Sequence, residues 1–400
     1  MKYRAIASML FVISCCVHLN AQEVKAPSFG KGIIDITGKD STWTMNLSGR
    51  MQFLSSATWQ DENDNLTNFN TDFLIRRARI KLKGYVFSKK LEYKVELGLS
   101  NRDIGGASVY TNNAPRYILD AVVKWNFYKN FSFWVGQTKL PGNVERVISS
   151  GSLQFVDRSL LNSRFTLDRD MGFQLRHHFN LGSGFTVREK FSLAQGEGRN
   201  ITVGNQGGYK YTGRIELLPF GLFEGSEYKG SDLTREKTPK LMFATTYDFN
   251  DDAVKTRSNM GSFMETDTGL YETDVSTLFV DMVFKYQGFS FMGEYAYREA
   301  DNPIAENSDG SLTGDIVEVG NGLNLQAGYL FKNNWELSTR YTNIDPKTIV
   351  STRDEQNQYT LGLSKYIVGH KLKVQTDVSY LAVNNNTNEL MARLQLEVHF

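Results

Sequence analysis

The chain has 400 residues, with 45 Lys and Arg against 44 Asp and Glu, which leaves a formal net charge of +1. A nucleic-acid-binding protein needs a net cationic surface, so this balance argues against that class. Proline is sparse at 7 residues, aromatic residues reach 12%, and no Pro- or Ser-rich linker interrupts the chain. One continuous architecture is therefore expected rather than several domains.

The N-terminus has the layout of a secretory signal peptide. Two basic residues precede an apolar run over residues 5–17, and a small residue stands at position 21. We predict a signal peptide over residues 1–21, followed by a short N-terminal periplasmic segment over 22–41. Both cysteines, Cys15 and Cys16, lie inside the signal, so the mature chain can form no disulfide. A lipoprotein signal with Cys15 as the lipidated residue is the alternative, and it is less favoured because an inserted protein needs no lipid anchor.

From residue 42 onward, apolar and polar side chains alternate along successive segments. Between Trp43 and Phe53, for example, every second residue is apolar or glycine. Successive side chains of a strand point to opposite faces, so this alternation predicts β-strands, and no segment after the signal shows a sustained helical period. The fold class is therefore all-β. Sixteen strands are predicted, over residues 42–59, 73–87, 91–100, 117–127, 131–138, 171–180, 183–195, 207–218, 239–250, 275–287, 288–299, 320–332, 334–345, 357–367, 370–382 and 389–400.

The segment RRARIKLKGY, residues 76–85, contains basic side chains at every second position from Arg77 to Lys83. As a strand, it has one cationic face and one apolar face. Two interpretations are open. The strand could belong to a soluble sheet and be half-exposed, or it could have lipid on one side and water on the other.

The predicted connections alternate in length and favour the second interpretation. Short turns are interleaved with long loops at residues 60–72, 101–116, 139–170, 251–274 and 300–319. An even number of strands with long loops at one end and short turns at the other is typical of a bacterial outer-membrane barrel. We predict a transmembrane antiparallel β-barrel of about 16 strands for residues 42–400, with long extracellular loops and mostly short periplasmic turns. Residues 219–238 break the pattern, because the alternation requires a short turn at this place and the segment is too long to be one.

The barrel prediction places the cations of the opening strands inside. A cation on the lipid-facing side near the midplane costs about 2–4 kcal/mol, so Arg77, Arg79, Lys81 and Lys83 should face a water-filled lumen. Lys124 has the same inward parity. Acidic residues of the next predicted strand partly neutralise this wall, so an unselective pore is the alternative to an anion-preferring one.

The connection over residues 139–170 is the expected constriction, because it is the longest and contains apolar residues unsuited to free solvent. The last predicted strand ends at Phe400, which is an outward-facing aromatic terminus. Such a terminus resembles the signal that outer-membrane barrels present to the barrel-assembly machinery. Outer-membrane lipid and lipopolysaccharide are the surroundings expected for the apolar outer face.

Five motifs, in order and across most of the mature chain, resemble the phosphate-selective porin O and P family. They are RRARIKLKG, LDAVVKWNF, WVGQTKLPGNVERVISSGSLQFVDRSLLN, RDMGFQL and REKTPKL. The resemblance implies a trimeric sixteen-stranded channel for small hydrophilic solutes, with the third long loop folded inward and Arg and Lys contacts to anions. The pathway residues expected on this basis, together with the inward cations, are Arg76, Arg77, Arg79, Lys81, Lys83, Lys124, Lys139, Arg146, Arg158, Arg164 and Arg169. The constriction loop departs from the lysine-rich pattern of phosphate-selective members, since Lys139 is its single lysine.

Enzyme chemistry finds little support in the sequence. No GxSxG, HExxH or Walker A motif is present, and no cofactor is expected. His177 and His178 are adjacent, so on a strand they cannot share a metal ion. A barrel enzyme and a structural or adhesin barrel with a blocked lumen stay open as alternatives. Glu189 falls on the outward parity of its strand, which predicts a bulge or a misplaced strand end there.

Overall fold

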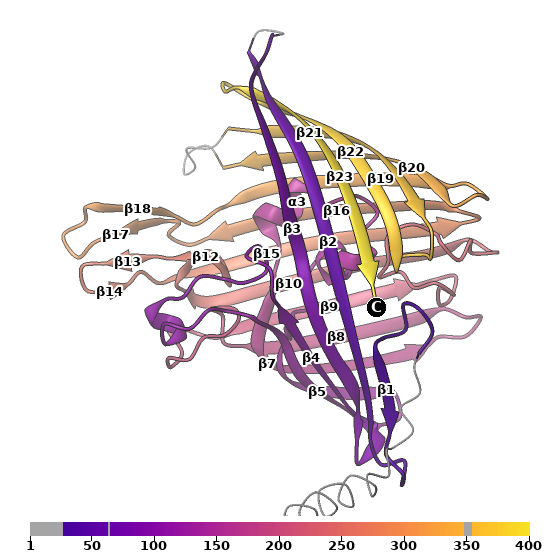
Figure 1. The fold of residues 1–400 in the computed structure, drawn as a ribbon. Coiled ribbons are helices and arrows are strands. Elements are labelled where there is room, and N and C mark those ends of the chain that lie inside the picture. Colours follow the sequence, from indigo (N-terminus) through magenta and orange to yellow (C-terminus); the bar gives the residue numbers. More distant parts are fainter. Residues whose placement is uncertain (1–26, 63–64, 348–353) are drawn as a thin grey trace, which may run out of the picture.

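The computed structural model describes residues 27–62, 65–347 and 354–400, so the predicted signal peptide lies outside the described residues. Sixteen antiparallel strands form a closed barrel (Figure 1). Each barrel strand pairs with the next along the chain, and β23 pairs back with β2, from Arg50 opposite His399 to Asp61 opposite Asn388. The barrel strands are β2 (Thr44–Glu62), β3 (Asn65–Val86), β4 (Ser88–Gly98), β5 (Ile118–Tyr128), β6 (Phe131–Lys139), β7 (Arg169–Asn180), β8 (Thr186–Ala194), β9 (Lys210–Leu218), β10 (Lys240–Ala253), β15 (Thr273–Tyr286), β16 (Phe289–Ala300), β19 (Gly320–Leu330), β20 (Trp335–Pro346), β21 (Gln356–Tyr366), β22 (Leu372–Val383) and β23 (Asn388–His399).

Each of the sixteen predicted strands corresponds to one barrel strand, but several predicted loops were wrong. Residues 60–72 are not a loop, because β2 and β3 continue as a long hairpin that projects beyond the barrel rim (Figure 1). The loops at 251–274 and 300–319 contain short hairpins: β11 (Lys255–Arg257) with β12 (Met260–Phe263), β13 (Glu265–Thr266) with β14 (Gly269–Leu270), and β17 (Ile304–Glu306) with β18 (Leu312–Ile316). Backbone hydrogen bonds hold these projecting strand pairs together outside the membrane. Their sequences therefore lack the lipid-facing apolar row by which the barrel strands were predicted.

The two described ends of the chain meet at the short-turn rim. β1 (Ile34–Thr37), within the predicted N-terminal segment, pairs with the start of β2. Phe400 exchanges backbone hydrogen bonds with Gly49 of β2, at 2.7 and 3.0 Å, and completes the closing seam. A Cβ atom at position 49 would lie 2.4 Å from the Phe400 ring, so glycine there lets the terminal aromatic ring lie flat against the barrel.

The outer face is mostly apolar, and one of its charged residues, Glu189, lies near the rim. Glu189 points outward as predicted, but the predicted bulge was wrong, because the β7–β8 register is continuous from Gly172 to Asn180. Its carboxylate lies 2.9 Å from the Nδ1 atom of His177, and the His177 ring stacks on Phe131. These side chains stand close to the 181–185 turn, where water reaches the strand end, so the charge needs no change of register.

The connection from β6 to β7 folds into the barrel. It contains α2 (Val144–Val147), the 3₁₀ turn η2 (Ser150–Ser152) and α3 (Leu160–Phe165). Most of its apolar side chains are buried, with Val144 and Leu161 both 0% exposed. A further 3₁₀ turn, η1 (Val109–Thr111), lies between β4 and β5. None of the helices in the described ranges is long and apolar enough to cross a bilayer.

Candidate pore constriction

A bulge in β3 points two consecutive arginines into the lumen. Gln52 of β2 is paired with Arg77 and the next residue, Phe53, with Ile75, so Arg76 is the extra residue. Strict alternation would send Arg76 to the lipid face. The bulge instead turns the Arg76 side chain inward, so the guanidinium groups of both arginines reach the same carboxylate.

That carboxylate belongs to Asp157 of the constriction loop, which we define as residues 140–168. Arg76 donates to Asp157 at 2.6 and 3.0 Å, and Arg77 donates to its other oxygen at 2.9 Å. Burial raises the pKa of the Asp157 carboxyl, but Arg77 and Arg76 outweigh burial and hold the pKa well below its ordinary value. Asp157 is therefore ionised at neutral pH and ties the loop to β3.

The constriction loop rests mainly on the opposite wall. The backbone N–H of Glu145 donates to Glu294 of β16 at 2.7 Å. Gln154 bonds Glu336 of β20 at 2.9 Å, and Lys373 of β22 donates to the carbonyl of Leu153 at 3.1 Å. Gln154 also contacts Gln326 of β19 and Ser364 of β21, so the loop closes this side of the lumen and leaves space toward β3–β7.

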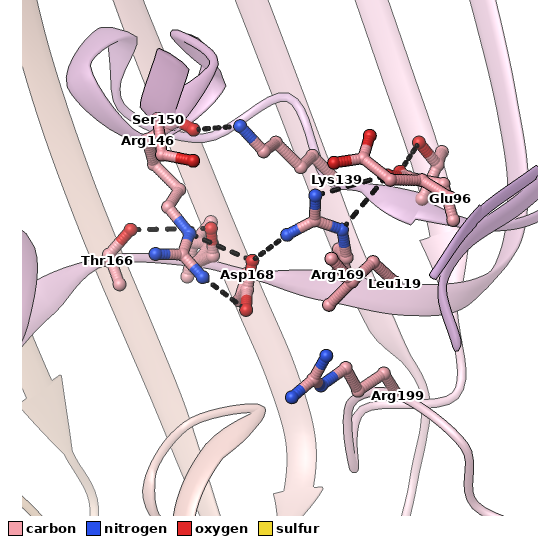
Figure 2. Close-up of polar contacts among 12 residues, drawn as sticks. Glu96, Leu119, Lys139, Arg146, Ser150, Thr166, Asp168, Arg169 and Arg199 are labelled. Carbon is pink, nitrogen blue, oxygen red and sulfur yellow. Dashed lines mark hydrogen bonds and ion pairs between the residues drawn. The ribbon is translucent and has the colours of Figure 1, made fainter. Parts of the chain in front are cut away.

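Around this space, basic groups are held in a fixed arrangement (Figure 2). Asp168 of the loop accepts from Arg146 at 2.8 Å and lies 3.5 Å from Arg169 of β7. Arg169 also donates to Asp120 of β5 at 3.1 Å. Burial raises the pKa of Asp168, but Arg146 and Arg169 outweigh it, so the net shift is downward and this carboxylate is also ionised at neutral pH.

Lys139, Arg158 and Arg199 are held by backbone carbonyl oxygens. The Lys139 ammonium donates to the carbonyl of Arg146 at 2.6 Å and to two further carbonyls at the end of α2. Arg158 donates to the carbonyls of Glu145 and Ile148 at 3.0 and 2.7 Å, and Arg199 donates to that of Asp103 at 2.6 Å. A carbonyl oxygen carries only a partial charge, so these three contacts orient the cations without neutralising them.

The space enclosed by these groups is a cavity of about 230 Å³, the central cavity. Its wall has nine basic residues and two acidic ones. Five carboxylates form ion pairs with cations of this wall, namely those of Glu96, Asp103, Asp120, Asp157 and Asp168. Nine against five leaves an excess of positive charge. The lining residues are Arg76, Arg77, Arg79, Arg102, Asp103, Leu119, Lys139, Arg146, Ser150, Arg158, Asp168, Arg169, Arg199 and Met260.

A narrower cavity of about 60 Å³ continues toward the short-turn end. It shares Arg79 with the central cavity and is lined further on by Arg50, Lys81 and Lys371. A volume of this size holds a few water molecules. The two cavities together define a cationic path along the β2–β7 side of the lumen.

Seven of the eleven predicted pathway residues line the central cavity: Arg76, Arg77, Arg79, Lys139, Arg146, Arg158 and Arg169. Lys81 lines the narrower cavity, and Lys83 and Lys124 line a rim pocket of about 410 Å³ at the short-turn end. Arg164 lies apart on α3, where it contacts Gln356 at 3.4 Å.

Sequence reasoning missed Arg102 and Arg199 as wall residues. Both lie in connections between barrel strands, where the two-residue period that identifies inward positions is absent. Arg50 of β2 is a further cation on the path, and it donates to Ser150 of the constriction loop at 2.8 Å. Only the tertiary contacts of the loops place these cations on the path.

Among the described residues, one group of carboxylates could hold a metal ion, and it lies away from the path. Oxygens of Asp251, Asp252 and Asp274 come within 4.8 Å of one another at the long-loop end. Exposed acidic groups of this kind are common without an ion, so no role is assigned to them.

A closed sixteen-stranded antiparallel barrel with an apolar outer face and a polar lumen narrowed by an inward-folded loop defines an outer-membrane porin. A sequence model of the family described as "Phosphate-selective porin O and P" matches residues 46–400. The chain therefore belongs to the phosphate-selective porin O and P family. An uncharacterized protein of Aquifex aeolicus (strain VF5) is 22% identical over 358 residues, which cover 82% of this chain and 81% of that protein.

Solved structures of porins share the fold at low sequence identity. OmpF of Salmonella typhi in complex with daunomycin has a TM-score of 0.56 at 13% identity, covering 92% of this chain and 100% of that one. The outer-membrane channel DcaP of Acinetobacter baumannii has a TM-score of 0.55 at 14% identity, covering 91% and 99%. The anion-selective porin from Comamonas acidovorans has a TM-score of 0.53 at 12% identity, covering 90% and 100%. Porin family membership and these neighbours favour a channel rather than an enzyme.

Proposed function

We propose that this porin allows passive diffusion of small hydrophilic solutes and prefers anions. The observation that carries the proposal is the charge of the central cavity, where nine basic side chains face five paired carboxylates. Charge focused in a narrow path with low-dielectric walls attracts counter-ions and repels ions of like sign. The sequence also raised the alternative that acidic residues of β4 neutralise the wall. Glu96 of β4 does pair with a wall cation, but an excess of positive charge remains after it is counted.

Phosphate is one anion among several on this proposal. Lys139 is the single lysine of the central cavity, and it is engaged with three carbonyl oxygens. The arginines of the wall are mostly engaged with carboxylates, so a free anion meets a positive potential rather than an empty chelating site. We therefore expect weak phosphate block of the chloride current.

The proposal is tested by recording from purified protein in planar bilayers. Conductance steps with a reversal potential that favours chloride over potassium in a salt gradient are expected. Correctly folded, heat-modifiable protein that gives no conductance steps would instead favour a structural barrel or a barrel enzyme. Conductance steps without ion preference would support a porin and contradict the proposed preference for anions.

We further propose a homotrimer, as family membership supports. Chemical cross-linking of the protein in native outer membranes should give a ladder that ends at three subunits. A ladder that ends at one subunit would remove this part of the proposal.

A further inference from the structure

Residues 219–238 connect β9 to β10 at the short-turn end, where a tight turn is the rule for this barrel. The segment instead enters the lumen and lies against the constriction loop. The backbone N–H of Gly230 donates to the carbonyl of Ser152 at 2.6 Å. A Cβ atom at position 230 would meet backbone atoms of residues 152–154 at 2.5–2.9 Å, so the two segments are in direct backbone contact.

The segment is anchored on nearly opposite walls. On one side, the hydroxyl of Tyr228 donates to Glu216 of β9. On the other side, Ser231 donates to Glu336 of β20 at 2.6 Å and contacts the Tyr366 hydroxyl of β21 at 2.6 Å. In the ring order of strands, β9 and β21 are six strands apart out of sixteen. A stretch of four residues therefore bridges the lumen.

Buried contacts fix the segment in place. Asp232, 0% exposed, accepts from the backbone N–H groups of Glu236 and Gly288, the latter at 2.8 Å. Lys285 of β15 donates to two carbonyls of the segment at 2.8 and 2.9 Å. Phe223 packs into an apolar cluster with constriction-loop residues that include Val144. Such a set of buried contacts describes a fixed element rather than a mobile turn.

We propose that residues 219–238 form a selectivity partition. Together with the constriction loop, this partition seals the half of the lumen lined by β8–β10, β15, β16 and β19–β22 and confines ions to the cationic path along β2–β7. The central cavity and the narrower cavity are lined by residues outside the partition, in agreement with this division. The inference rests on the proposed channel function and identifies the element that gives the channel its selectivity.

The charges in the sealed half explain why its closure matters. Arg214 pairs with Glu216 and Asp281, and Lys190 also pairs with Glu216. The buried side chains of the strands that line this half include six cations and six carboxylates, whereas cations are in excess along the open path. If the sealed half were emptied, it would conduct both ion signs and dilute the preference of the cationic path.

The main test replaces residues 221–239 with a four-residue Asn-Gly turn, which is sterically feasible because Leu217 of β9 is already paired with Phe243 of β10. Conductance should rise by less than twofold, because the constriction loop still fills its side of the sealed half and only the space vacated by the partition would conduct, and the chloride-over-potassium preference should fall toward unity. A matched control shortens the exposed β17–β18 hairpin and should leave both quantities unchanged. Unchanged conductance and selectivity in the shortened, folded barrel would overturn the partition.

A point variant and a labelling experiment guard against misfolding and against failure of the channel proposal itself. Gly230→Leu should push the partition off the constriction loop and give a smaller change of the same sign. Tyr366 of β21 is 1% exposed, its hydroxyl lies 2.6 Å from that of Ser231 in the partition, and residues 22–400 contain no cysteine. A Tyr366→Cys reporter should resist an anionic thiol reagent in the full-length barrel and react at least tenfold faster in the shortened one. Equal reaction rates would overturn the partition, and this readout needs no ion current.

Discussion

Arg76 and Arg77 are neighbours along β3, yet both donate to the carboxylate of Asp157, at 2.6 and 2.9 Å. Neighbouring side chains of a regular strand cannot do this, because they point to opposite faces. The bulge opposite Gln52 and Phe53 turns both arginines inward. One irregular residue thus adds a charge to the lumen and gives the constriction loop its attachment to β3.

Replacing Arg77 and Arg79 with glutamine should lower the chloride-over-potassium permeability ratio by roughly twofold or more, because two cations leave the wall of a narrow path. Both groups line the central cavity. Reversal potentials in a salt gradient measure the effect, and the double variant Lys129→Gln, Lys332→Gln, in two exposed short turns, is the charge-matched control. Loss of folded barrel with unchanged selectivity in the surviving channels would assign these arginines to assembly.

Asp157→Asn should change selectivity in the opposite direction. The substitution removes the shared partner of Arg76 and Arg77, so the net positive charge of the path rises by one. We expect a roughly twofold higher chloride preference and a lower thermal midpoint, because the loop loses its ion pair to β3. Asp157→Glu keeps the charge and serves as control. A lower or equal chloride preference in Asp157→Asn would show that this carboxylate does not limit the anion potential.

Deletion of Phe400 should slow assembly. The residue closes the seam through two backbone hydrogen bonds with Gly49, and its ring covers that glycine. The rate at which heat-modifiable barrel appears after synthesis measures the effect, and Phe331→Ala, at the same rim but away from the seam, is the control. Gly49→Val should act in the same direction because its side chain would collide with the ring. Normal assembly of the deletion variant would remove both the seam argument and the predicted terminal signal.

Glu197, in the loop between β8 and β9, gives a pH prediction. Burial raises the pKa of Glu197 from 4.5 to about 7. The folded loop then holds its proton more tightly than the unfolded chain, so the stability of the loop falls as pH rises from 4.5 to about 7. Amide exchange in residues 195–209, corrected for the intrinsic rate, should show more frequent opening at pH 8 than at pH 5. In Glu197→Gln this difference should vanish, and a difference that persists would place its cause elsewhere.

The sixteen barrel strands could be read from the sequence because lipid outside and water inside impose a two-residue period on every strand. The inward direction of Arg77, Arg79, Lys81 and Lys83 follows from that period alone. The same reasoning could not place Arg76. The outward row changes from odd-numbered to even-numbered positions at the bulge, and the run Phe73, Leu74 and Ile75 hides this change because it is apolar at both parities. Sequence reasoning also treated residues 60–72 as a loop, because a hairpin held by backbone hydrogen bonds outside the membrane needs no apolar row.

The pore inside the barrel was decided by tertiary structure. Arg102 and Arg199 reach the cavity wall from loops, whose positions depend on packing between segments distant in sequence. The sequence marked residues 219–238 only as a turn that was too long. Their course across the lumen comes from contacts with β9, β20 and the constriction loop. Alternation along a strand is a local property that single residues encode, whereas the filling of an enclosed space depends on which remote surfaces fit together.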